Sequence, residues 1–364
     1  ARLVVVVTFT FSGAVKLNDP LGTAYKLQDY AQAFGLQALM QGVTPVVLSV
    51  VLAMLEFSVG IYLLFGIRRR RTSILALAFM LAFTPLTLYL AVANPVRDCG
   101  CFGDALVLTN WQTFWKNVVL LASAILLVCK TRLMTRLITE RHQWTVSLCT
   151  WAFSLIFAGM SLYGLPPIDF LPYRIGVNLR EKLAERDAAQ GQTKTYFIME
   201  KNGERREFAT EDYPDSTWTY IDTRVEGTQS SAESPYADFC MQTADGKDLT
   251  DEVMQDTSYV FLLLSPYLEQ ADDGVLDIIT SAYDYAQEHG YRFYCLTSSG
   301  RETIATWQEM TGAEYPFLFT DGIVLKTMIR SNPGLMLLHD GRITGKWPST
   351  GMPDLTEEVR PLEQ

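Results

Sequence analysis

Cys99 and Cys101 are separated by a single glycine, in a short polar segment between two long apolar runs. Thiols this close can form and break a disulfide, and Gly100 and Gly103 let the backbone turn tightly around them. A disulfide across one residue closes a small, strained ring that is easy to reduce, which favours a redox role. The alternatives are a static disulfide or half of a metal site.

Charged residues flank the two cysteines on both sides. Arg97 can stabilise a thiolate, whereas Asp98 and Asp104 oppose one or accept protons. Each of the three can equally serve only to keep the segment solvated. The candidate catalytic residues are therefore Cys99, Cys101, Arg97, Asp98 and Asp104.

A second candidate site is centred on an acidic residue, Glu56, within an apolar run. Glu56 stands near the middle of the apolar run Pro45 to Ile67, where an ionised carboxylate costs about 2.5 kcal/mol or more. It should face the bundle interior, be protonated, or be paired with Lys16 or Lys116, which lie near the outer ends of neighbouring runs. Two interpretations stay open for these three residues: a proton or quinone site, with the cofactor itself unknown, or polar contacts that hold helices together.

The elements that position these residues follow from an uneven composition. The chain has 364 residues and a net charge of −10, with apolar runs crowding its first half and acidic and polar residues its second. This pattern predicts a membrane protein with a soluble appendage. Nucleic acid is excluded as a partner by the acidic appendage, and no pair among the three histidines has metal-ligand spacing, so no metal is expected.

Five apolar runs are each long enough to cross about 30 Å of hydrocarbon. Arginines 68–71 and the basic residues between Lys130 and Arg141 predict cytoplasmic loops by the positive-inside bias. The cysteine segment and everything after Leu165 then lie outside, where disulfides persist. We expect a multi-pass protein of the bacterial inner (cytoplasmic) membrane whose C-terminal domain is periplasmic. The predicted spans are Arg2 to Val15, Pro45 to Ile67, Thr72 to Ala93, Trp111 to Cys129 and Thr145 to Leu165.

The first of these runs has a competing interpretation as a signal peptide. Against it, the run lacks a convincing small-residue cleavage site and continues into an amphipathic connector, Tyr25 to Leu39. We therefore expect a transmembrane helix there.

The second half predicts a linker followed by an α/β domain. A proline-rich exit from the membrane (165–172) precedes a helix at Lys182 to Gln192. A small β-insert follows, with strands at Thr195 to Met199 and Trp218 to Thr223 and a turn at Asn202-Gly203. Strands then alternate with helices, which predicts a mainly parallel sheet with an antiparallel end. The expected strands are Phe239 to Thr243, Ser258 to Leu264, Tyr291 to Thr297, Pro316 to Thr320, Leu335 to His339 and Arg342 to Trp347; the helices are Gly274 to His289, Glu302 to Thr311 and Ile323 to Arg330.

The first half resembles the DoxX family and its methylamine-utilisation (MauE-like) branch. The matching pieces are Phe11-Ser12-Gly13 with Lys16-Leu17, Glu56 followed by Gly60, and the segment from Cys99 to Asp104. The resemblance implies a four-helix transmembrane domain over residues 1–130 and a role in disulfide formation or maturation of exported proteins. Residues 131–165 then supply a cytoplasmic connector and a fifth, tethering helix.

Residues 234–364 resemble a thioredoxin-like domain, reached through a linker and β-insert at 166–233. In that family a Cys-x-x-Cys follows the first buried strand and opens the next helix, where the dipole lowers the thiol pKa. Here that position is Ser265-Pro266-Tyr267-Leu268, without cysteine, and Pro333 matches the family's cis-proline. The resemblance implies a domain that keeps its peptide-binding face and cannot exchange disulfides in the usual way.

Four further cysteines lie outside the paired site. Cys240 and Cys295 fall on predicted neighbouring strands, where buried thiols are favoured over a structural disulfide or a redox pair. Cys129 and Cys149 fall near the cytoplasmic ends of their spans, far from Cys99, and are expected to be small apolar helix residues.

The predicted fold class is mixed: an α-helical transmembrane bundle, with a four-helix DoxX-like core plus a fifth tethering helix, followed by an extracytoplasmic α/β thioredoxin-like domain. The first functional hypothesis is a thiol-disulfide redox protein that acts through Cys99 and Cys101. The second is a non-catalytic membrane scaffold that binds partner proteins through its degenerate thioredoxin-like domain. The expected partners are an exported client protein or a partner subunit, and membrane lipid.

Overall fold

The computed structural model describes residues 1–96, 99–191, 194–201, 204–209, 219–226 and 234–355. The chain forms two compact units, Ala1–Leu171 and Pro172–Gln364. The first unit is helical, and the second contains both sheets of the described chain.

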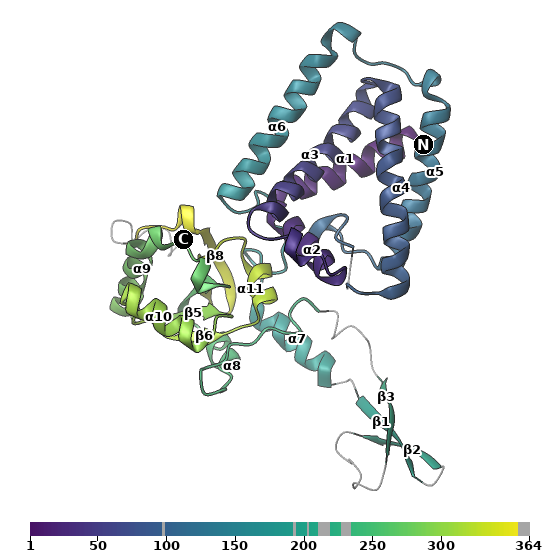
Figure 1. The fold of residues 1–364 in the computed structure, drawn as a ribbon. Coiled ribbons are helices and arrows are strands. Elements are labelled where there is room, and N and C mark those ends of the chain that lie inside the picture. The colour runs from purple at the N-terminus through teal and green to yellow at the C-terminus, as the bar shows by residue number, and fades with distance from the viewer. Residues whose placement is uncertain (97–98, 192–193, 202–203, 210–218, 227–233, 356–364) are drawn as a thin grey trace. The chain divides into compact units, whose positions relative to one another are not determined.

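The described residues of the first unit contain six α-helices (Figure 1). Within the described residues, the stretches long and apolar enough to cross a membrane are Thr44–Phe65, Arg69–Ala93, Asn110–Cys129 and Glu140–Tyr163. They correspond to four of the predicted spans. The other predicted span is a helix of 17 residues, and its membrane crossing stays a prediction. The helices are α1 (Arg2–Asn18), α2 (Pro20–Ala33), α3 (Thr44–Phe65), α4 (Arg69–Ala93), α5 (Asn110–Cys129) and α6 (Gln143–Tyr163).

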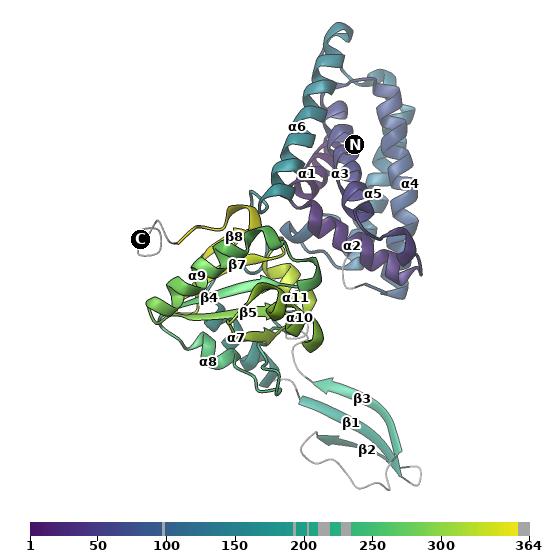
Figure 2. The same cartoon turned by 60° about the vertical axis from the view of Figure 1, so that its left-hand side comes forward.

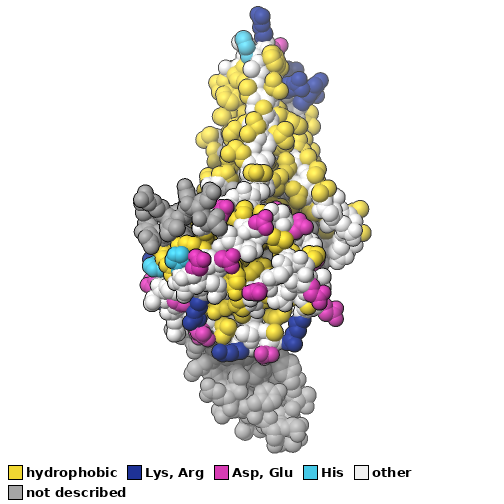
Figure 3. All heavy atoms as spheres, turned by 90° about the vertical axis from the view of Figure 1, so that its left-hand side faces the viewer, with side chains coloured by type: hydrophobic (Ala, Val, Ile, Leu, Met, Phe, Trp, Pro, Cys, Tyr) yellow, Lys and Arg dark blue, Asp and Glu magenta, His cyan; other side chains and the backbone are white. Residues whose placement is uncertain are grey.

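Apolar side chains cover the outside of this unit, with lysine and arginine gathered at one end (Figure 3). Leu75, Val92, Leu126 and Ile156 are among the exposed large apolar residues. An apolar surface of this extent is stable against lipid and unstable in water. The chain is a membrane protein.

Close backbone contact joins α1 to α3. A Cβ added to Gly13 would lie 2.4 Å from the backbone nitrogen of Phe57, and one added to Gly60 would lie 2.3 Å from Thr10 Oγ1. Small residues at both crossing points let the two helices approach more closely than side chains would allow. The Arg2 guanidinium then ties the start of α1 to the end of α3, because it donates hydrogen bonds to the carbonyls of Leu63 and Leu64, both at 2.8 Å.

At the other end of the bundle, α2 lies across the ends of the longer helices (Figures 1 and 2). Its start is set by sequence: Asp19 Oδ1 accepts a hydrogen bond from the Gly22 amide at 2.8 Å, and Pro20 occupies the first turn. The predicted amphipathic connector Tyr25 to Leu39 is this helix plus a short 3₁₀ turn, Gln37–Leu39.

The second unit begins with α7 (Leu179–Gly191) and a three-stranded antiparallel sheet of order β2-β1-β3. Two of its strands, β1 (Lys194–Lys201) and β3 (Thr219–Glu226), were predicted, whereas β2 (Glu204–Ala209) was not. The predicted turn at Asn202-Gly203 lies outside the described residues.

A five-stranded mixed sheet of order β6-β5-β4-β7-β8 forms the rest of the unit. The first three strands are parallel and the last two antiparallel, so the predicted mainly parallel sheet with an antiparallel end is confirmed. This mixed sheet with its helices is consistent with a thioredoxin-like fold. The elements are α8 (Thr250–Met254), β4 (Tyr259–Ser265), α9 (Leu276–Glu288), β5 (Arg292–Thr297), α10 (Arg301–Thr311), β6 (Phe317–Phe319), α11 (Gly322–Met328), β7 (Gly334–His339) and β8 (Arg342–Pro348).

Both faces of the central strand are covered. Phe261 and Leu263 on β4 join a core that includes residues of α9 and α10, while Leu262, which points to the opposite face, is also fully buried. Strands buried on both faces read as continuous apolar runs, which is why the sequence predicts β4 and β5 well.

Backbone segments pair with both edges of this sheet. On β6, Phe319 exchanges two backbone hydrogen bonds with Gln242, at 2.7 and 3.0 Å. On β8, the Ile343 amide donates a hydrogen bond to the Val177 carbonyl, and the Ile343 carbonyl accepts one from the Gly176 amide. The predicted strand Phe239 to Thr243 is therefore wrong: it is reduced to isolated bridges at Gln242, because the chain turns back at Thr243.

Candidate functional site: a dithiol loop at the end of the helical unit

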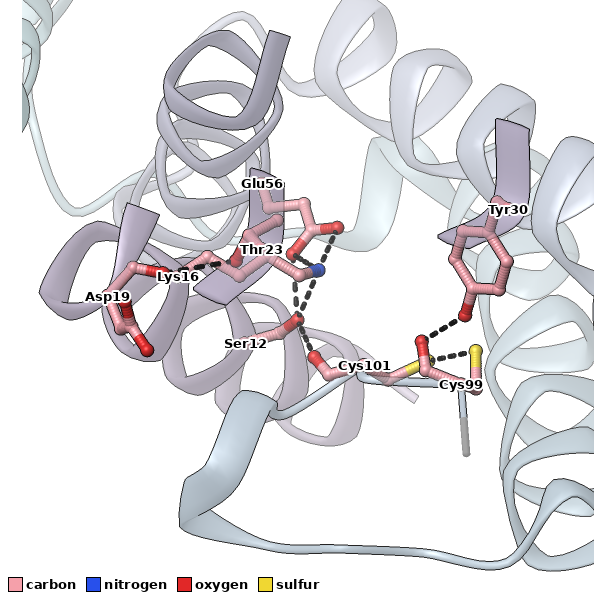
Figure 4. Close-up of polar contacts among 8 residues, drawn as sticks. All are labelled: Ser12, Lys16, Asp19, Thr23, Tyr30, Glu56, Cys99 and Cys101. Carbon is pink, nitrogen blue, oxygen red and sulfur yellow. Dashed lines mark hydrogen bonds and ion pairs between the residues drawn. The ribbon is translucent and has the colours of Figure 1, made fainter. Parts of the chain in front are cut away.

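The two cysteines lie in the loop between α4 and α5. Both are free thiols, with their sulfur atoms 3.0 Å apart (Figure 4). Gly100 has φ +60° and Gly103 has φ +52°, the left-handed region that favours glycine. A Cβ at Gly100 would also come within 3.1 Å of the Lys26 side chain on α2. The two thiols therefore lie within reach of disulfide formation.

Two helices hold the loop by its carbonyl groups. The Tyr30 hydroxyl on α2 donates a hydrogen bond to the carbonyl oxygen of Cys99, and Ser12 Oγ on α1 lies 2.8 Å from the carbonyl oxygen of Cys101 (Figure 4). Cys99 itself is buried, with 8% of its surface exposed. The residues on both sides of Gly100 are thus held at their carbonyl groups by α1 and α2.

A buried ion pair contacts the Ser12 hydroxyl. Lys16 Nζ on α1 contacts both carboxylate oxygens of Glu56 on α3, at 2.6 and 2.7 Å. Both residues are buried, with 7% and 6% of their surfaces exposed. An ion pair with this geometry offsets part of the cost of burying either charge alone.

Ser12 links this ion pair to the cysteine loop. Its oxygen accepts a hydrogen bond from Lys16 Nζ at 3.1 Å and lies 2.7 Å from Glu56 Oε2. A hydroxyl has one proton, so Ser12 donates either to Glu56 or to the carbonyl of Cys101 at any moment. The loop and the ion pair therefore share a single donor.

Lys116 on α5 approaches the loop separately from the ion pair. Its ammonium lies over the ring of Phe102, 4.1 Å from the ring centre, and Phe11 packs edge-on against the same ring. Of the two lysines proposed as partners of Glu56, Lys16 makes that contact, and Lys116 makes a cation–π contact beside the cysteines instead.

The two thiols differ in acidity because of these contacts. The hydrogen bond from Cys99 lowers the pKa of Cys101 to about 6, with the charges of Lys116 and Lys16 acting in the same direction and burial opposing them. The pKa of Cys99 is raised, first by that shared hydrogen bond and then by burial. Cys101 is thus the more acidic of the two thiols.

Of the charged residues that flank the cysteines, Asp104 is described and the other two are not. Arg97 and Asp98 lie outside the described residues, and Asp104 is half-buried in the 3₁₀ turn Gly103–Ala105. Sequence analysis did not select Ser12 or Tyr30 as site residues. Ser12 had a signal, since it belongs to the Phe11-Ser12-Gly13 piece of the family resemblance, whereas Tyr30 had none beyond its place in an amphipathic helix.

A small hollow borders the described part of the loop. The hollow lined by Cys101, Phe102, Leu106, Leu108 and their neighbours has no interior volume that would hold a water molecule. Lys16 and Glu56 already satisfy each other. The assignment of Glu56, Lys16 and Lys116 to a cofactor stays a prediction, and no step is derived from one.

The second unit carries a polar cluster where β4 ends. Ser265 Oγ donates to Asn332 Oδ1 at 2.7 Å, and Asn332 Nδ2 donates to the Tyr267 carbonyl at 2.8 Å. The Asn332-Pro333 peptide bond is cis. Ser265-Pro266-Tyr267-Leu268 thus lies beside Pro333, at the end of the central strand.

The remaining cysteines are isolated free thiols. Cys295 on β5 is fully buried, and burial raises its pKa; burial also raises the pKa of Cys240. The placement of Cys240 on a strand was wrong, because it precedes the isolated bridges at Gln242 and is half-buried. Cys129 and Cys149 are exposed on the outside of the helical unit.

Comparison with known proteins bears directly on the helices around the dithiol loop. Residues 1–130 match the family of methylamine utilisation protein MauE. The MauE match spans α1 to α5 and so contains Ser12, Lys16, Glu56 and both cysteines of the loop. Residues 193–226, which carry β1 to β3, match a domain of unknown function, DUF8463.

A comparison with solved structures finds a further likeness to part of the chain. A protein described as a protein disulfide isomerase from Bacteroides thetaiotaomicron is similar at 16% identity, with a TM-score of 0.27, over 31% of this chain and 76% of that chain. Among curated proteins, none matches.

Proposed function

We propose that this chain is a membrane-anchored thiol-disulfide redox protein that supports disulfide formation or maturation of exported proteins. The observation that carries the proposal is the pair of free thiols whose sulfur atoms lie 3.0 Å apart, and the contact between them lowers the pKa of Cys101. A thiolate beside a second thiol is the arrangement that thiol-disulfide exchange requires. The MauE match over the same residues and the thioredoxin-like second unit support a redox or accessory role in the membrane.

The reaction is an exchange between this pair and the thiols of a client protein. When two client thiols become a disulfide, the Cys99–Cys101 disulfide takes up the two electrons and two protons that the client loses. In the opposite direction, the client disulfide takes them up from the two thiols. Either direction needs only the two cysteines and a client with two thiols or a disulfide.

We place the protein in the bacterial inner membrane, with the dithiol loop and the second unit in the periplasm. Arginines 68–71 lie at the end of α3 that is remote from the loop, which supports a cytoplasmic position for that end. Asn18, at the loop end of α1, exchanges two hydrogen bonds with the backbone of Ile168, at 2.8 and 3.0 Å. The chain therefore leaves the helical unit at the same end as the loop.

The second unit is assigned to binding rather than exchange. The position after β4, where a thioredoxin-like domain carries its cysteines, is Ser265-Pro266-Tyr267-Leu268, and the free thiols Cys240 and Cys295 have raised pKa values. We propose that this degenerate thioredoxin-like unit presents an exported client or partner subunit. The wider likeness of residues 1–130 to the DoxX family belongs to the same proposal.

Thiol trapping in the native membrane tests this function. Cells are quenched with acid, free thiols are alkylated, and the oxidation state of the peptide carrying Cys99 and Cys101 is measured by mass spectrometry. We expect a mixture of dithiol and disulfide that shifts when growth conditions change, and loss of client maturation in the Cys99→Ser/Cys101→Ser variant.

A scaffold function is the second candidate, and the burial of Cys99 favours it. Cys99 is 8% exposed, and the hollow beside Cys101 admits no water. If the two cysteines never change oxidation state and the double serine variant complements fully, the protein is a membrane scaffold that binds partners through its second unit.

A further inference from the structure

We propose that a groove between α3 and α6 binds one anionic phospholipid, with an acyl chain in the groove and the headgroup among the basic residues at its outer end. The groove has a volume of about 290 Å³, and it is lined by Phe57, Ile61 and Phe65 of α3 and by residues of α6 between Thr145 and Phe153. It shares no residue with the cysteine loop. The proposal therefore goes beyond the redox function and does not depend on it.

The two helices pack tightly on one side of the groove and leave it open on the other. Ala53 and Ala158, with 0% and 1% of their surfaces exposed, belong to one buried cluster of α3 and α6. One turn further along, the rings of Phe57 and Phe153 pack with their centres 5.8 Å apart. This ring contact is the inner end of the groove. From there the groove extends to the level where α3 ends and α6 begins, which is its outer end.

The groove suits an apolar ligand. Thr150 in its lining is buried, and its hydroxyl donates a hydrogen bond to the Val146 carbonyl at 2.8 Å, so that this donor is already used. Trp151 Nε1 donates a hydrogen bond to the Tyr62 hydroxyl at 3.0 Å, which ties α6 to α3 beside the groove. Water is not stable among apolar side chains, and an empty groove would lose dispersion contacts. In a membrane, hydrocarbon fills such a groove.

The length of the groove fits one acyl chain. Along α3 it runs eight positions from Phe57 to Phe65, which is about 12 Å at 1.5 Å per residue. One leaflet supplies about 15 Å of the roughly 30 Å hydrocarbon core, so the groove covers most of one leaflet. An acyl chain runs from the headgroup to the midplane, as the groove does. A transmembrane helix of a partner would need a contact surface across the whole core.

Basic segments meet at the outer end of the groove. The Arg68 amide donates a hydrogen bond to Gln143 Oε1 at 3.2 Å, which joins the start of α4 to the first residue of α6. The Leu137 amide donates to the Phe65 carbonyl at 3.0 Å, which fixes the connector between α5 and α6 at the end of α3. The side chains of Arg68 and Arg141 are exposed there, at the end of the unit where lysine and arginine gather (Figure 3).

The charge at this end is positive. Residues 68–71 are four arginines, and residues 130–141 contain four further basic residues and one carboxylate, Glu140. Glu140 pairs with Arg136 of the same segment. An anionic headgroup is attracted by the remaining excess, whereas a zwitterionic headgroup carries its own cation and is attracted less. The apolar groove and the adjoining charge together select an anionic phospholipid.

Native mass spectrometry of the full-length protein measures this binding. The protein in detergent is titrated with dioleoyl phosphatidylglycerol or with dioleoyl phosphatidylcholine, which has the same acyl chains, and bound lipid is counted from the mass. We expect one phosphatidylglycerol to bind at least about tenfold more tightly than phosphatidylcholine. Equal binding of the two lipids overturns the proposal.

Two tryptophan variants of α6 test the position of the acyl chain. Cys149→Trp places an indole in the groove and should weaken phosphatidylglycerol binding about tenfold. Leu148→Trp is the matched control, because residue 148 is exposed and lies outside the groove lining, and it should bind lipid like wild type. Equal losses in both variants, or no loss in Cys149→Trp, overturn the site. A wild-type dimer that Cys149→Trp abolishes also overturns it, because the groove is then an interface between two copies.

Two double variants test the position of the headgroup. Arg68→Gln/Arg141→Gln removes two charges at the outer end of the groove and should reduce the preference for phosphatidylglycerol about tenfold. Lys130→Gln/Arg132→Gln removes two charges where α5 ends and should keep most of the preference. Equal reductions overturn the headgroup position, because the charge of the whole surface would then select the lipid.

Cys149 reports occupancy of the groove without a substitution. Cys149 lines the groove, whereas Cys129 is exposed at the end of α5, so their modification by N-ethylmaleimide is compared by mass spectrometry. Phosphatidylglycerol at about ten times its dissociation constant should slow modification of Cys149 about tenfold and leave Cys129 unchanged. Equal slowing of both contradicts the proposal. Cys99→Ser/Cys101→Ser should bind the lipid like wild type, so lipid binding and the redox function can fail separately.

Discussion

The Lys16 ammonium contacts both carboxylate oxygens of Glu56, inside the helical unit and between two helices in close backbone contact. Ser12 joins this pair to the carbonyl of Cys101 at 2.8 Å. The position of the dithiol loop therefore depends on a charge pair that does not itself react.

Removing one partner of this pair should cost more stability than removing both. In Lys16→Met the Glu56 carboxylate is buried without a counter-charge, which costs about 3–5 kcal/mol for buried pairs in proteins. In Lys16→Met/Glu56→Leu neither charge is buried, so we expect a higher melting temperature than in the single variant. Thermal unfolding in detergent, followed by tryptophan fluorescence, measures the difference; a double variant as unstable as the single one contradicts the expectation.

The glycines between α1 and α3 should not tolerate a methyl group. Gly13→Ala places a Cβ 2.4 Å from the Phe57 backbone nitrogen, so the helices must separate and the Lys16–Glu56 contact must lengthen. We expect a melting temperature lower by several degrees. Gly159→Ala on α6, where a Cβ meets nothing within 4 Å, is the control and should be neutral or slightly stabilising.

The acidity of Cys101 should depend on the hydrogen bond from residue 99. With its pKa near 6 instead of the ordinary 9.0, Cys101 is a thiolate above about pH 6 and loses that charge as the pH falls through 6. Iodoacetamide alkylation of Cys101 in the reduced protein should follow this profile. Cys99→Ala removes the donor and should move the midpoint upward, whereas Cys99→Ser, whose hydroxyl can still donate, should move it less. Equal profiles in the two variants would show that the lysines alone set the acidity.

Tyr30 should restrain the loop through its hydroxyl. Tyr30→Phe removes the hydrogen bond to the Cys99 carbonyl, worth about 1 kcal/mol, and leaves the ring in place. We expect faster amide hydrogen exchange in the segment that carries Cys99 and Cys101, because the loop opens more often. Tyr25→Phe on the same helix is the comparison variant, and a rate that rises equally there would point to general loosening of α2.

The second unit should show no exchange of its own. Insulin reduction by dithiothreitol should not be accelerated by the full-length Cys99→Ser/Cys101→Ser variant, because burial raises the pKa of Cys295 and of Cys240 and no second thiol is paired with either. Acceleration by this variant would disprove the assignment of the unit to binding.

Local sequence patterns predicted most helices and strands, because the length and apolar pattern of a segment can be recognised without knowing what it packs against. Apolar length gives α3 to α6, and doubly buried runs give β4 and β5. Strand β2 escaped prediction because Glu204-Arg205-Arg206-Glu207 is charged, which is atypical of a strand. The backbone pairing of β2 with β1 stabilises the strand, although its own residues do not favour one.

The reactive cysteines of the loop could be predicted from the sequence, but the residues that hold the loop in place could not. The spacing of Cys99 and Cys101 signals reactive sulfur, but Ser12 and Tyr30 lie 89 and 69 positions away from the carbonyls that they contact. Hydropathy likewise could not choose between Lys16 and Lys116 as the partner of Glu56. The choice depends on how helices rotate in the bundle, which is a property of packing.

The hydrogen-bonded edges of the five-stranded sheet matter for a protein held on a surface. Molecules tethered to a bilayer meet one another at high local density, and an uncovered strand would recruit a neighbour's strand and seed aggregation. Gln242 on one side and Val177 on the other occupy those backbone groups from within the same chain. These contacts within the chain therefore oppose edge-to-edge pairing of the sheet with neighbouring molecules on the membrane.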